Sequence, residues 1–368
     1  MKKKMAIFTG PGRNFRIESA EVAAPEPGMA GLQLLSSGIC GTDVHIHQGF
    51  LKMPELEMIL GHEFIGRIDQ LGENAGRDAL GRELAPGDRA VACVALPCGK
   101  CFNCLHGETA SCLAFGVTYI KAAAEAPHFH GGFAEYLFSP ATNLVKLPDA
   151  VETRAAAAFP CGGPTVIRAC EYGGGLKKDE IVVIQGNGSL GLFALAYAKA
   201  RGCTTAIIGS TANPERMELT GALTPDFFFD YRHVAAEEIA RQIREFAQAR
   251  GRGDGADVVI ETSGAREALP AGLGYLRTRG RYLVPGQYSD RGEVAILPHL
   301  ITFRALRIFG SGQYTFADIG AYLDFLVAHP ELQKIFGRMV RGYRVEAADT
   351  AVADAAAGRA VKAVFEGA

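Results

Sequence analysis

A short apolar segment followed by a glycine-rich turn is the feature that most restricts how this chain folds. Residues 181–184 are apolar throughout, and Gly186, Gly188 and Gly191 then form the pattern G-x-G-x-x-G ahead of a predicted helix that runs to Arg201. The glycine pattern alone is weak evidence. Between a strand and a helix it is typical of a dinucleotide-binding fold, because the glycines let a pyrophosphate approach the amides at the helix N-terminus. The alternative is a purely structural glycine turn.

Strands and helices alternate after this turn. Further strands are predicted over residues 205–209, 258–261, 281–285 and 304–310, with helices over 235–250 and 265–276. Such alternation predicts an α/β fold with a doubly wound parallel sheet, in which helices cover both faces.

The first part of the chain has a different, β-rich pattern. Residues 5–37 alternate apolar and polar positions between Gly and Pro turns, and further strands are predicted over 65–71 and 89–94. Helices are predicted over residues 149–158 and 164–172. Since 368 residues exceed the usual size of one hydrophobic core, we expect two domains. A helix near 319–328 and a strand near 361–365 are expected to return to the first domain.

Metal-binding side chains gather between residues 38 and 63. Cys40, Asp43, His62 and Glu63 combine a thiol, an imidazole and two carboxylates, which together look like half of a metal site. A catalytic zinc ion usually takes three protein ligands and leaves a fourth position for water or substrate. Cys161 is the best candidate to complete the set, and the alternative is that it is a buried thiol without a metal.

Four more cysteines follow the pattern C-x-x-C-x-x-C-x7-C. Four thiolates at this spacing satisfy a closed, structural zinc site. An iron–sulfur cluster uses similar spacings, and reduced thiols are the other alternative. The four residues are Cys98, Cys101, Cys104 and Cys112, whereas Cys93, Cys170 and Cys203 are expected to be core thiols.

The composition excludes several classes of protein. The formal net charge of -2 does not indicate a nucleic-acid binder, and no segment approaches the roughly 20 apolar residues of a membrane helix. We therefore expect a cytoplasmic protein without membrane or nucleic-acid partners. A rival hypothesis is a zinc-binding interaction protein without catalysis, but Lys100 is the only fixed positive charge between Cys98 and Cys112, so phosphate binding there would be weak.

With these residues placed, the chain resembles the zinc-containing medium-chain alcohol dehydrogenases, the family that also includes sorbitol and threonine dehydrogenases. The resemblance rests on residues 38–45, on Gly61-His62-Glu63, on the four-cysteine pattern, on Cys161 followed by Thr165, and on the glycine turn. It implies a GroES-like catalytic domain over residues 1–162 and 312–368, with a Rossmann domain over 163–311. It also implies a zinc-dependent oxidoreductase that transfers a hydride between an alcohol, or its aldehyde or ketone, and NAD(P). A polyol or amino-alcohol dehydrogenase of the same family stays open.

The resemblance assigns the metal ligands. Cys40, His62 and Cys161 are expected to hold a catalytic zinc, and Glu63 is expected to lie close enough to approach it. The four-cysteine pattern is expected to hold a second, structural zinc. Relatives of the polyol type use a carboxylate near the position of Cys161, so a cysteine is closer to the alcohol dehydrogenase arrangement.

Further residues are expected to act beside the metal. Thr42 and His45 are the predicted proton relay, and Asp43 is predicted to orient His62 through its other ring nitrogen. A solvated surface histidine and a simple turn cap are the respective alternatives for His45 and Asp43.

Cofactor contacts follow from the same resemblance. The expected residues are Gly186, Gly188, Leu190 and Gly191 at the pyrophosphate turn, Thr165 and the backbone of Pro285, Gly286 and Gln287 near the nicotinamide, and Lys362 facing the pyrophosphate, unless Lys362 is an ordinary surface lysine.

The preference between NAD and NADP is left open by the sequence. An acidic residue about 20 positions after the glycine turn normally binds the adenosine ribose of NAD. Residues 209–213 of this chain contain no carboxylate. Ser210, Thr211 and Arg216 are candidates to receive the 2'-phosphate of NADP, although Arg216 is equally explained as a solvated helix residue.

The substrate pocket and the oligomeric state have weaker signals. The candidates for an apolar substrate pocket are Phe50, Val94, Phe115 and Phe129. The candidates for a pocket that binds a hydroxylated substrate are His47, Gln48 and His128. The apolar segment 305–309 is predicted to form an uncovered sheet edge, which favours a homodimer or homotetramer. The expected partner is a small alcohol or carbonyl substrate.

Overall fold

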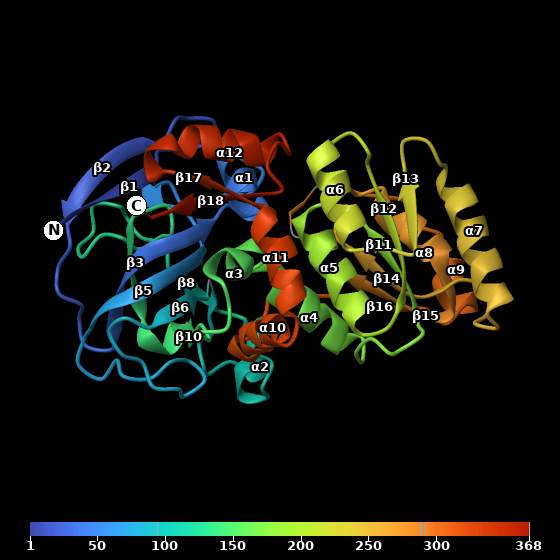
Figure 1. Ribbon diagram of the computed structural model, residues 1–368, viewed down its shortest axis with the longest axis horizontal. Coiled ribbons are helices and arrows are strands. Elements are labelled where there is room, and N and C mark those ends of the chain that lie inside the picture. The colour runs from blue at the N-terminus through green and yellow to red at the C-terminus, as the bar shows by residue number, and fades with distance from the viewer. Residues whose placement is uncertain (94, 288, 291, 368) are drawn as a thin grey trace. The chain divides into compact units, whose positions relative to one another are not determined.

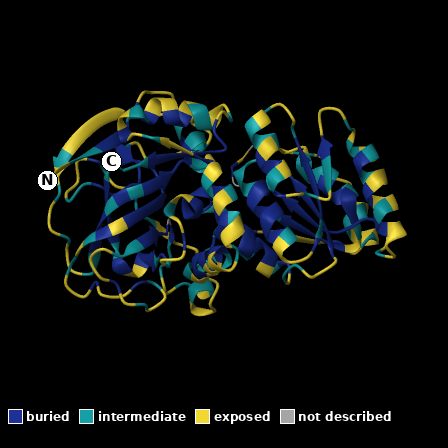
Figure 2. Ribbon diagram, in the orientation of Figure 1, coloured by how far each residue is buried: buried dark blue, intermediate teal, exposed yellow. Residues whose placement is uncertain are grey.

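The computed structural model describes residues 1–93, 95–287, 289–290 and 292–367. The chain divides into two compact units, one made of residues 1–164 and 313–368 and the other of residues 165–312. Figure 1 shows the helices and strands of both units, and Figure 2 shows their buried and exposed residues. Among the described residues, no helix is both long and apolar enough to cross a membrane.

The first unit is built mainly of strands. Its elements are β1 (Lys2–Phe8), β2 (Arg16–Glu21), β3 (Met29–Gly38), α1 (Gly41–His47), β4 (Met58–Ile59), β5 (Glu63–Leu71), β6 (Arg89–Ala92), β7 (Ala95–Leu96), α2 (Phe102–Leu105), β8 (Gly116–Val117), β9 (Tyr136–Pro140), β10 (Leu144–Lys146), α3 (Thr153–Ala158), α4 (Gly162–Tyr172, which continues into the second unit), α10 (Phe316–Ala328), α11 (Pro330–Arg338), β17 (Val340–Tyr343), α12 (Ala348–Ala356) and β18 (Lys362–Glu366).

One sheet of this unit pairs strands from the first 150 residues with the two strands near the C-terminus. Its strands lie in the order β10-β6-β5-β3-β18-β17, and β9 also pairs with β3. The antiparallel pairing of β3 with β18 places Gly38 opposite Val364, and the pairing of β3 with β5 places Gly38 opposite Glu63. Three segments that are far apart in sequence therefore meet at the end of β3.

The second unit has six parallel strands and helices on both faces. Its elements are β11 (Ile181–Gln185), α5 (Ser189–Ala200), β12 (Thr204–Gly209), α6 (Pro214–Ala222), β13 (Phe227–Asp230), α7 (Ala236–Ala249), β14 (Ala256–Glu261), α8 (Ala268–Tyr275), β15 (Leu276–Val284), α9 (Pro298–Phe303) and β16 (Arg307–Gly310). The strand order is β13-β12-β11-β14-β15-β16, with every neighbouring pair parallel. The predicted α/β fold class is confirmed.

Hydrophobic burial explains why this sheet is covered on both faces. β11 is buried over its whole length, as expected for a parallel strand between two helix layers. On α7 the buried residues Ile239, Ile243 and Ala247 are four apart, so one stripe of the helix packs on the sheet while the rest faces solvent. The blue strands and the yellow outer side of α7 in Figure 2 show this division.

Some predicted boundaries differ from the structure. The helix predicted over 149–158 begins only at Thr153, because residues 148–151 form a turn in which Val151 N donates to Pro148 O. The predicted strand over 304–310 begins at Arg307. Val94, predicted at the end of β6, lies outside the described residues. The elements α6, β13, α9, α11, β17 and α12 were not predicted, and β13 is the most consequential omission because its last residue reaches the cofactor side of the sheet.

Candidate metal and cofactor sites

The end of β3 and the start of β5 carry a cluster of metal-binding side chains. Donor atoms of Cys40, His62, Glu63 and Cys161 all lie within 4.8 Å of one another. Cys40 is the N-cap residue of α1, His62 precedes β5, and Cys161 lies between α3 and α4. A side chain at Gly38 would place its Cβ 1.9 Å from a carboxylate oxygen of Glu63, so any larger residue would displace that carboxylate from its place in the cluster.

The donor set fits zinc. Ligands that each lie about 2.0–2.3 Å from one zinc ion must lie within about twice that distance of one another. Two thiols and one imidazole are also the ligand types that zinc prefers, and His62 and Glu63 are buried. Cys40, His62, Glu63 and Cys161, which the sequence analysis assigned to one metal site, are therefore neighbours in the structure.

Asp43 supports this cluster from the first turn of α1. Its side chain is fully buried, accepts a hydrogen bond from Cys40 N at 2.8 Å, and lies 3.5 Å from His62 Nδ1. Burial alone would lower the pKa of His62, but the charges of Asp43 and Cys40 raise it. Asp43 therefore both accepts from the N-cap amide of α1 and faces the imidazole. Its role in orienting His62 stays a prediction.

Lys362 forms a buried ion pair with Glu63. It is 5% exposed, its Nζ contacts a Glu63 carboxylate oxygen, and it lies 3.5 Å from Ile39 O. Burial alone would lower the pKa of Lys362, but the charge of Glu63 raises it. The alternative of an ordinary surface lysine is wrong, because β18 pairs with β3 and carries this residue into the core. The contact of Lys362 with a cofactor pyrophosphate stays a prediction.

The remaining predicted residues of α1 lie nearby. Thr42 Oγ1 is 3.8 Å from Cys40 Sγ, and His45 is half-buried one turn further along the helix, with its ring 6.2 Å from that of Phe50. Two aromatic residues were not predicted. Tyr119 is buried and stacks on His62 at 6.1 Å, and the pKa of the buried Tyr314 is raised by burial and by Cys161.

The candidate pocket residues are scattered. Phe129 is fully buried, whereas Phe50 is exposed and Phe115 is exposed beside Cys112; Val94 is not among the described residues. His47 stacks on Phe15 at 5.4 Å, Gln48 ends α1, and His128 Nδ1 lies 2.9 Å from Ala123 O. These placements identify no common substrate pocket.

The four remaining metal-binding cysteines form a second cluster. The Sγ atoms of Cys98, Cys101, Cys104 and Cys112 lie within 4.8 Å of one another, around α2. Cys112 Sγ accepts hydrogen bonds from Cys98 N at 3.3 Å and Ala114 N at 3.4 Å, and the former lowers the pKa of Cys112. Such N–H donors favour thiolates, which are the form that binds zinc. The protein therefore has two candidate zinc sites.

The glycine turn has the backbone geometry that its residues predicted. Gly186 has φ +111°, and a Cβ on Gly191 would lie 1.9 Å from Gly186 O, so neither position accepts another residue. Gly188 is the N-cap residue of α5, and nothing lies within 4 Å of the place where its Cβ would be. Leu190 is in the first turn of that helix. The turn leaves the helix amides accessible to an anion.

The other predicted cofactor residues of this unit lie on its helix α4 and on the loop after β15. Thr165 is buried in α4. Pro285 directly follows β15, Gly286 N donates to Glu261 O at 3.0 Å, and Gln287 Nε2 donates to Ala265 O at 2.9 Å. Their nicotinamide contacts stay predictions.

Ser210 is tied to the glycine turn by Asn187. Asn187 Nδ2 donates to Ser210 O at 3.1 Å, and Ser210 N donates to Asn187 Oδ1 at 3.2 Å. Thr211 bonds to Asp230, at the end of the unpredicted strand β13, and Asp230 in turn pairs with Arg232. Sequence reasoning missed these two residues, because a four-residue strand with three phenylalanines carries no alternating pattern.

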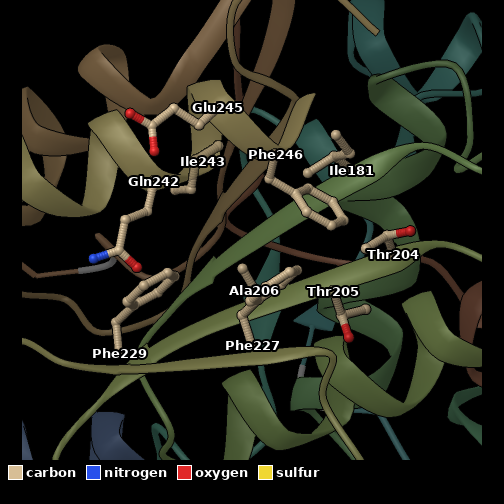
Figure 3. Close-up of a pocket in the computed structure, with 10 residues that line it drawn as sticks. All are labelled: Ile181, Thr204, Thr205, Ala206, Phe227, Phe229, Gln242, Ile243, Glu245 and Phe246. Carbon is tan, nitrogen blue, oxygen red and sulfur yellow. The ribbon is translucent and has the colours of Figure 1, made fainter. Parts of the chain in front are cut away.

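A cavity of about 280 Å³ lies elsewhere in this unit (Figure 3). Phe227, Phe229, Ile243 and Phe246 line it, and the first residues of β11 and β12, Ile181 and Thr204, also contribute. Because the strands are parallel, their N-terminal ends all lie on one side of the sheet, and the glycine turn lies at the opposite, C-terminal ends. The cavity is therefore separate from the cofactor side.

Two family models match the chain. Residues 26–149 match the alcohol dehydrogenase GroES-like domain, and residues 189–328 match the zinc-binding dehydrogenase family. The 5-exo-hydroxycamphor dehydrogenase of Pseudomonas putida is 31% identical over 300 residues, which cover 80% of this chain and 80% of that protein. The L-threonine 3-dehydrogenase of Pyrococcus horikoshii is 31% identical over 317 residues, covering 84% and 83%.

Solved structures have the same fold. An alcohol dehydrogenase from Thermotoga maritima superposes with a TM-score of 0.90 at 24% identity, covering 100% of both chains. A protein from Sinorhizobium meliloti 1021, described as a zinc-binding dehydrogenase and bound to NADP, gives a TM-score of 0.82 at 26% identity and covers 100% of this chain and 99% of that one.

Proposed function

Because the chain belongs to the zinc-containing medium-chain alcohol dehydrogenase family, we propose that it transfers a hydride between an alcohol, or its aldehyde or ketone, and NAD(P). One observation carries the proposal: donor atoms of Cys40, His62, Glu63 and Cys161 gather within 4.8 Å in a partly buried site. Cys40, His62 and Cys161 match the ligand types of a catalytic zinc site. The fourth residue, Glu63, forms an ion pair with Lys362.

The ligands would be Cys40, His62 and Cys161, as two thiolates and a neutral imidazole. A zinc ion held there supplies a Lewis acid that stabilises negative charge on a substrate oxygen. Asp43, 3.5 Å from His62 Nδ1, orients the imidazole so that its other nitrogen faces the cluster. Lys362 neutralises Glu63, so that the carboxylate stays beside the ligands without an unpaired buried charge.

The proton that leaves the alcohol needs a route to solvent. Thr42 carries the hydroxyl nearest to Cys40, at 3.8 Å from its sulfur, and His45 follows three residues later on α1. Residues three apart lie on one face of a helix with their Cβ atoms about 5–6 Å apart, so the proton would pass from the hydroxyl to the half-buried imidazole through the cofactor ribose. A nicotinamide held beside Thr165 and residues 285–287 would supply the acceptor for the hydride of the substrate carbon.

An amino-alcohol or polyol is the second candidate substrate class. Two kinds of relative favour it: the L-threonine 3-dehydrogenase of Pyrococcus horikoshii, and a sorbitol dehydrogenase of Halalkalibacterium halodurans that is 28% identical over 331 residues. The 5-exo-hydroxycamphor dehydrogenase favours an apolar secondary alcohol instead. The thiol at Cys161 supports the alcohol arrangement over the polyol one.

A substrate panel tests the proposal. Simple alcohols, polyols and amino-alcohols are assayed with both nicotinamide cofactors on protein whose zinc content is measured, and we expect turnover with two zinc ions per chain. Cys170→Ala, at a buried thiol outside both clusters, is the matched control for substitutions of Cys161. A fully metallated protein without turnover on any of these substrates would refute the proposal. A single zinc per chain would favour the zinc-binding interaction protein.

We also propose that the chain forms a homodimer or homotetramer. β16 is the edge strand of the parallel sheet, with Ile308 43% exposed, and Phe303 just before it is 88% exposed. An uncovered apolar edge favours pairing with a second copy. Light scattering is expected to give at least twice the chain mass, and a monomer at micromolar concentration would refute this.

A further inference from the structure

The end of β12 lacks the carboxylate that normally binds the ribose of NAD. Gly209 ends this strand, and a Cβ there would lie 2.4 Å from Asn187 Cγ. The two hydrogen bonds between Asn187 and Ser210 then hold the next residue beside the glycine turn. A hydroxyl, rather than an acid, therefore occupies the place next to the pyrophosphate turn.

A carboxylate of the adjacent strand lies beside the end of β12, but its oxygens are already saturated with hydrogen bonds. Asp230 pairs with Gly209 across β13 and β12. Its Oδ2 accepts from Thr211 N at 3.1 Å, Thr211 Oγ1 at 2.6 Å and Arg232 Nη2 at 2.7 Å, and its Oδ1 accepts from Arg232 N at 3.0 Å and Nε at 3.1 Å. A carboxylate offers about four lone-pair sites. Asp230 thus has none left for ribose hydroxyls.

The same bonds fix Arg232 in place. Its Nη2 also donates to Thr211 Oγ1 at 2.6 Å, so the guanidinium lies against the residue that follows Ser210. The side chain is 36% exposed, and among the described residues its Nη1 meets no acceptor. An arginine whose orientation is set by a carboxylate on one side presents its remaining donors to an anion on the other.

A second arginine lies on α6, close enough to Tyr231, the residue before Arg232, for their electrostatic interaction to affect its pKa. Arg216 is in the first turn of that helix, and its N donates to Asn213 Oδ1 at 2.9 Å. Its Nε is buried and has no acceptor in the described part of the chain. Burial lowers the pKa of Arg216, and Tyr231 and Glu215 offset only part of that effect. A buried, unsatisfied guanidinium nitrogen is unfavourable until an acceptor binds.

From this geometry we propose that the chain prefers NADP, with Arg232 and Arg216 binding the 2'-phosphate of the adenosine ribose and Ser210 contributing its hydroxyl. Asp230 is a positioning residue that orients Arg232 and has its own charge cancelled. The inference rests on the proposed function, because it concerns the cofactor of that reaction.

Cofactor binding to the full-length protein tests the proposal without requiring turnover. The dissociation constants of NADPH and NADH are measured from nicotinamide fluorescence, and those of 2',5'-ADP and 5'-AMP by calorimetry. We expect at least tenfold tighter binding of NADPH and of 2',5'-ADP. Arg216→Ala and Arg232→Ala should each weaken NADPH binding by about 10- to 100-fold and change NADH binding by less than twofold, since each removes a charge-assisted hydrogen bond to the phosphate.

Two further variants make the result specific. Arg244→Ala removes an exposed arginine of α7 and should change neither constant. Ser210→Asp restores a carboxylate at the end of β12 and should reverse the preference toward NADH. Thermal unfolding of every variant verifies that the fold is retained.

The outcomes separate this inference from the proposed function. Equal or tighter binding of NADH by the wild-type protein, with dehydrogenase turnover, overturns the inference and leaves the proposed function intact. Equal weakening of both cofactors by Arg232→Ala also overturns it, because the arginine then has a structural role. Binding of neither cofactor by the folded protein overturns both.

Discussion

Replacing Asp43 by asparagine isolates one contact of the candidate catalytic site. In the native protein, Cys40 N donates to Asp43 Oδ2 at 2.8 Å. The side-chain oxygen of asparagine can accept the same hydrogen bond, so the cap of α1 is retained. The amide group then faces His62 Nδ1, where a carboxylate oxygen stands at 3.5 Å in the native protein. An NH2 group there cannot accept from Nδ1–H, and the imidazole loses the partner that sets its tautomer.

The expected magnitude follows from the burial of this contact. Asp43 is fully buried, so no water replaces the lost acceptor. The 3.5 Å contact is longer than a normal hydrogen bond, and we expect it to shorten to one when zinc fixes the imidazole. A hydrogen bond to a charged acceptor contributes about 1.5–3 kcal/mol. Asp43→Asn should therefore weaken zinc binding at the Cys40 cluster by about 10- to 150-fold, with a parallel loss of turnover at limiting zinc.

Competition with a chelator of known affinity measures this change. The four-cysteine site serves as an internal reference, since no side chain of that cluster contacts Asp43 and its zinc affinity should stay unchanged. Asp69→Asn is the matched control, because this carboxylate of the same unit accepts from Gln33 and Tyr136 and is outside both clusters.

Two results would contradict the reasoning. Zinc affinity within twofold of the wild type would mean that Asp43 only caps α1. Equal loss of both zinc ions, with a lower unfolding temperature in chelator, would mean that the substitution disturbs the fold rather than the imidazole.

Three other predictions concern the metal sites and the second unit. Cys161→Ala should abolish turnover while leaving NAD(P)H fluorescence binding nearly intact, and wild-type turnover would show that Cys161 is no ligand. Cys98→Ser should lower the zinc content from two ions per chain to one and lower the unfolding temperature, as checked by metal analysis and calorimetry; two retained zinc ions would exclude the four-cysteine site. Asp257 binds Arg252 at 2.8 Å and Arg277 at 2.7 Å. Burial alone would raise the pKa of Asp257, but these bonds lower it. Its stabilising effect is therefore present above the unfolded pKa of about 3.9 and is lost as the pH falls through the lower folded value. Urea unfolding below about pH 4 should show this loss, and Asp257→Asn should have a flatter pH profile; identical slopes would refute the assignment.

Local sequence patterns predicted much of the fold and the four-cysteine candidate zinc site. The apolar segment of β11 and the glycine turn predicted the start of the parallel sheet. The strand, the turn and the helix follow one another within a few residues, so the pattern can be recognised in the sequence alone. The spacing of Cys98 to Cys112 predicted the second cluster for the same reason: short loops bring thiols at this separation to one centre.

Elements with weak local signals were missed. β13 has only four residues and lies in a sequence without alternation, and its existence depends on pairing with β12. As a result, the sequence indicated that an acid was absent after β12 but not that Asp230 stands beside Thr211.

The sequence by itself determined which chemical groups this protein has for binding a metal and a dinucleotide, since residue type and short spacing are properties of the chain. Tertiary structure alone decided how those groups are paired. Strand register places Glu63 and Lys362 at the end of β3 and places Asp230 opposite Gly209. Register arises from hydrogen bonds and packing between segments far apart in sequence, so no local pattern specifies that Lys362 is buried against Glu63 or that Arg232 lies against Thr211.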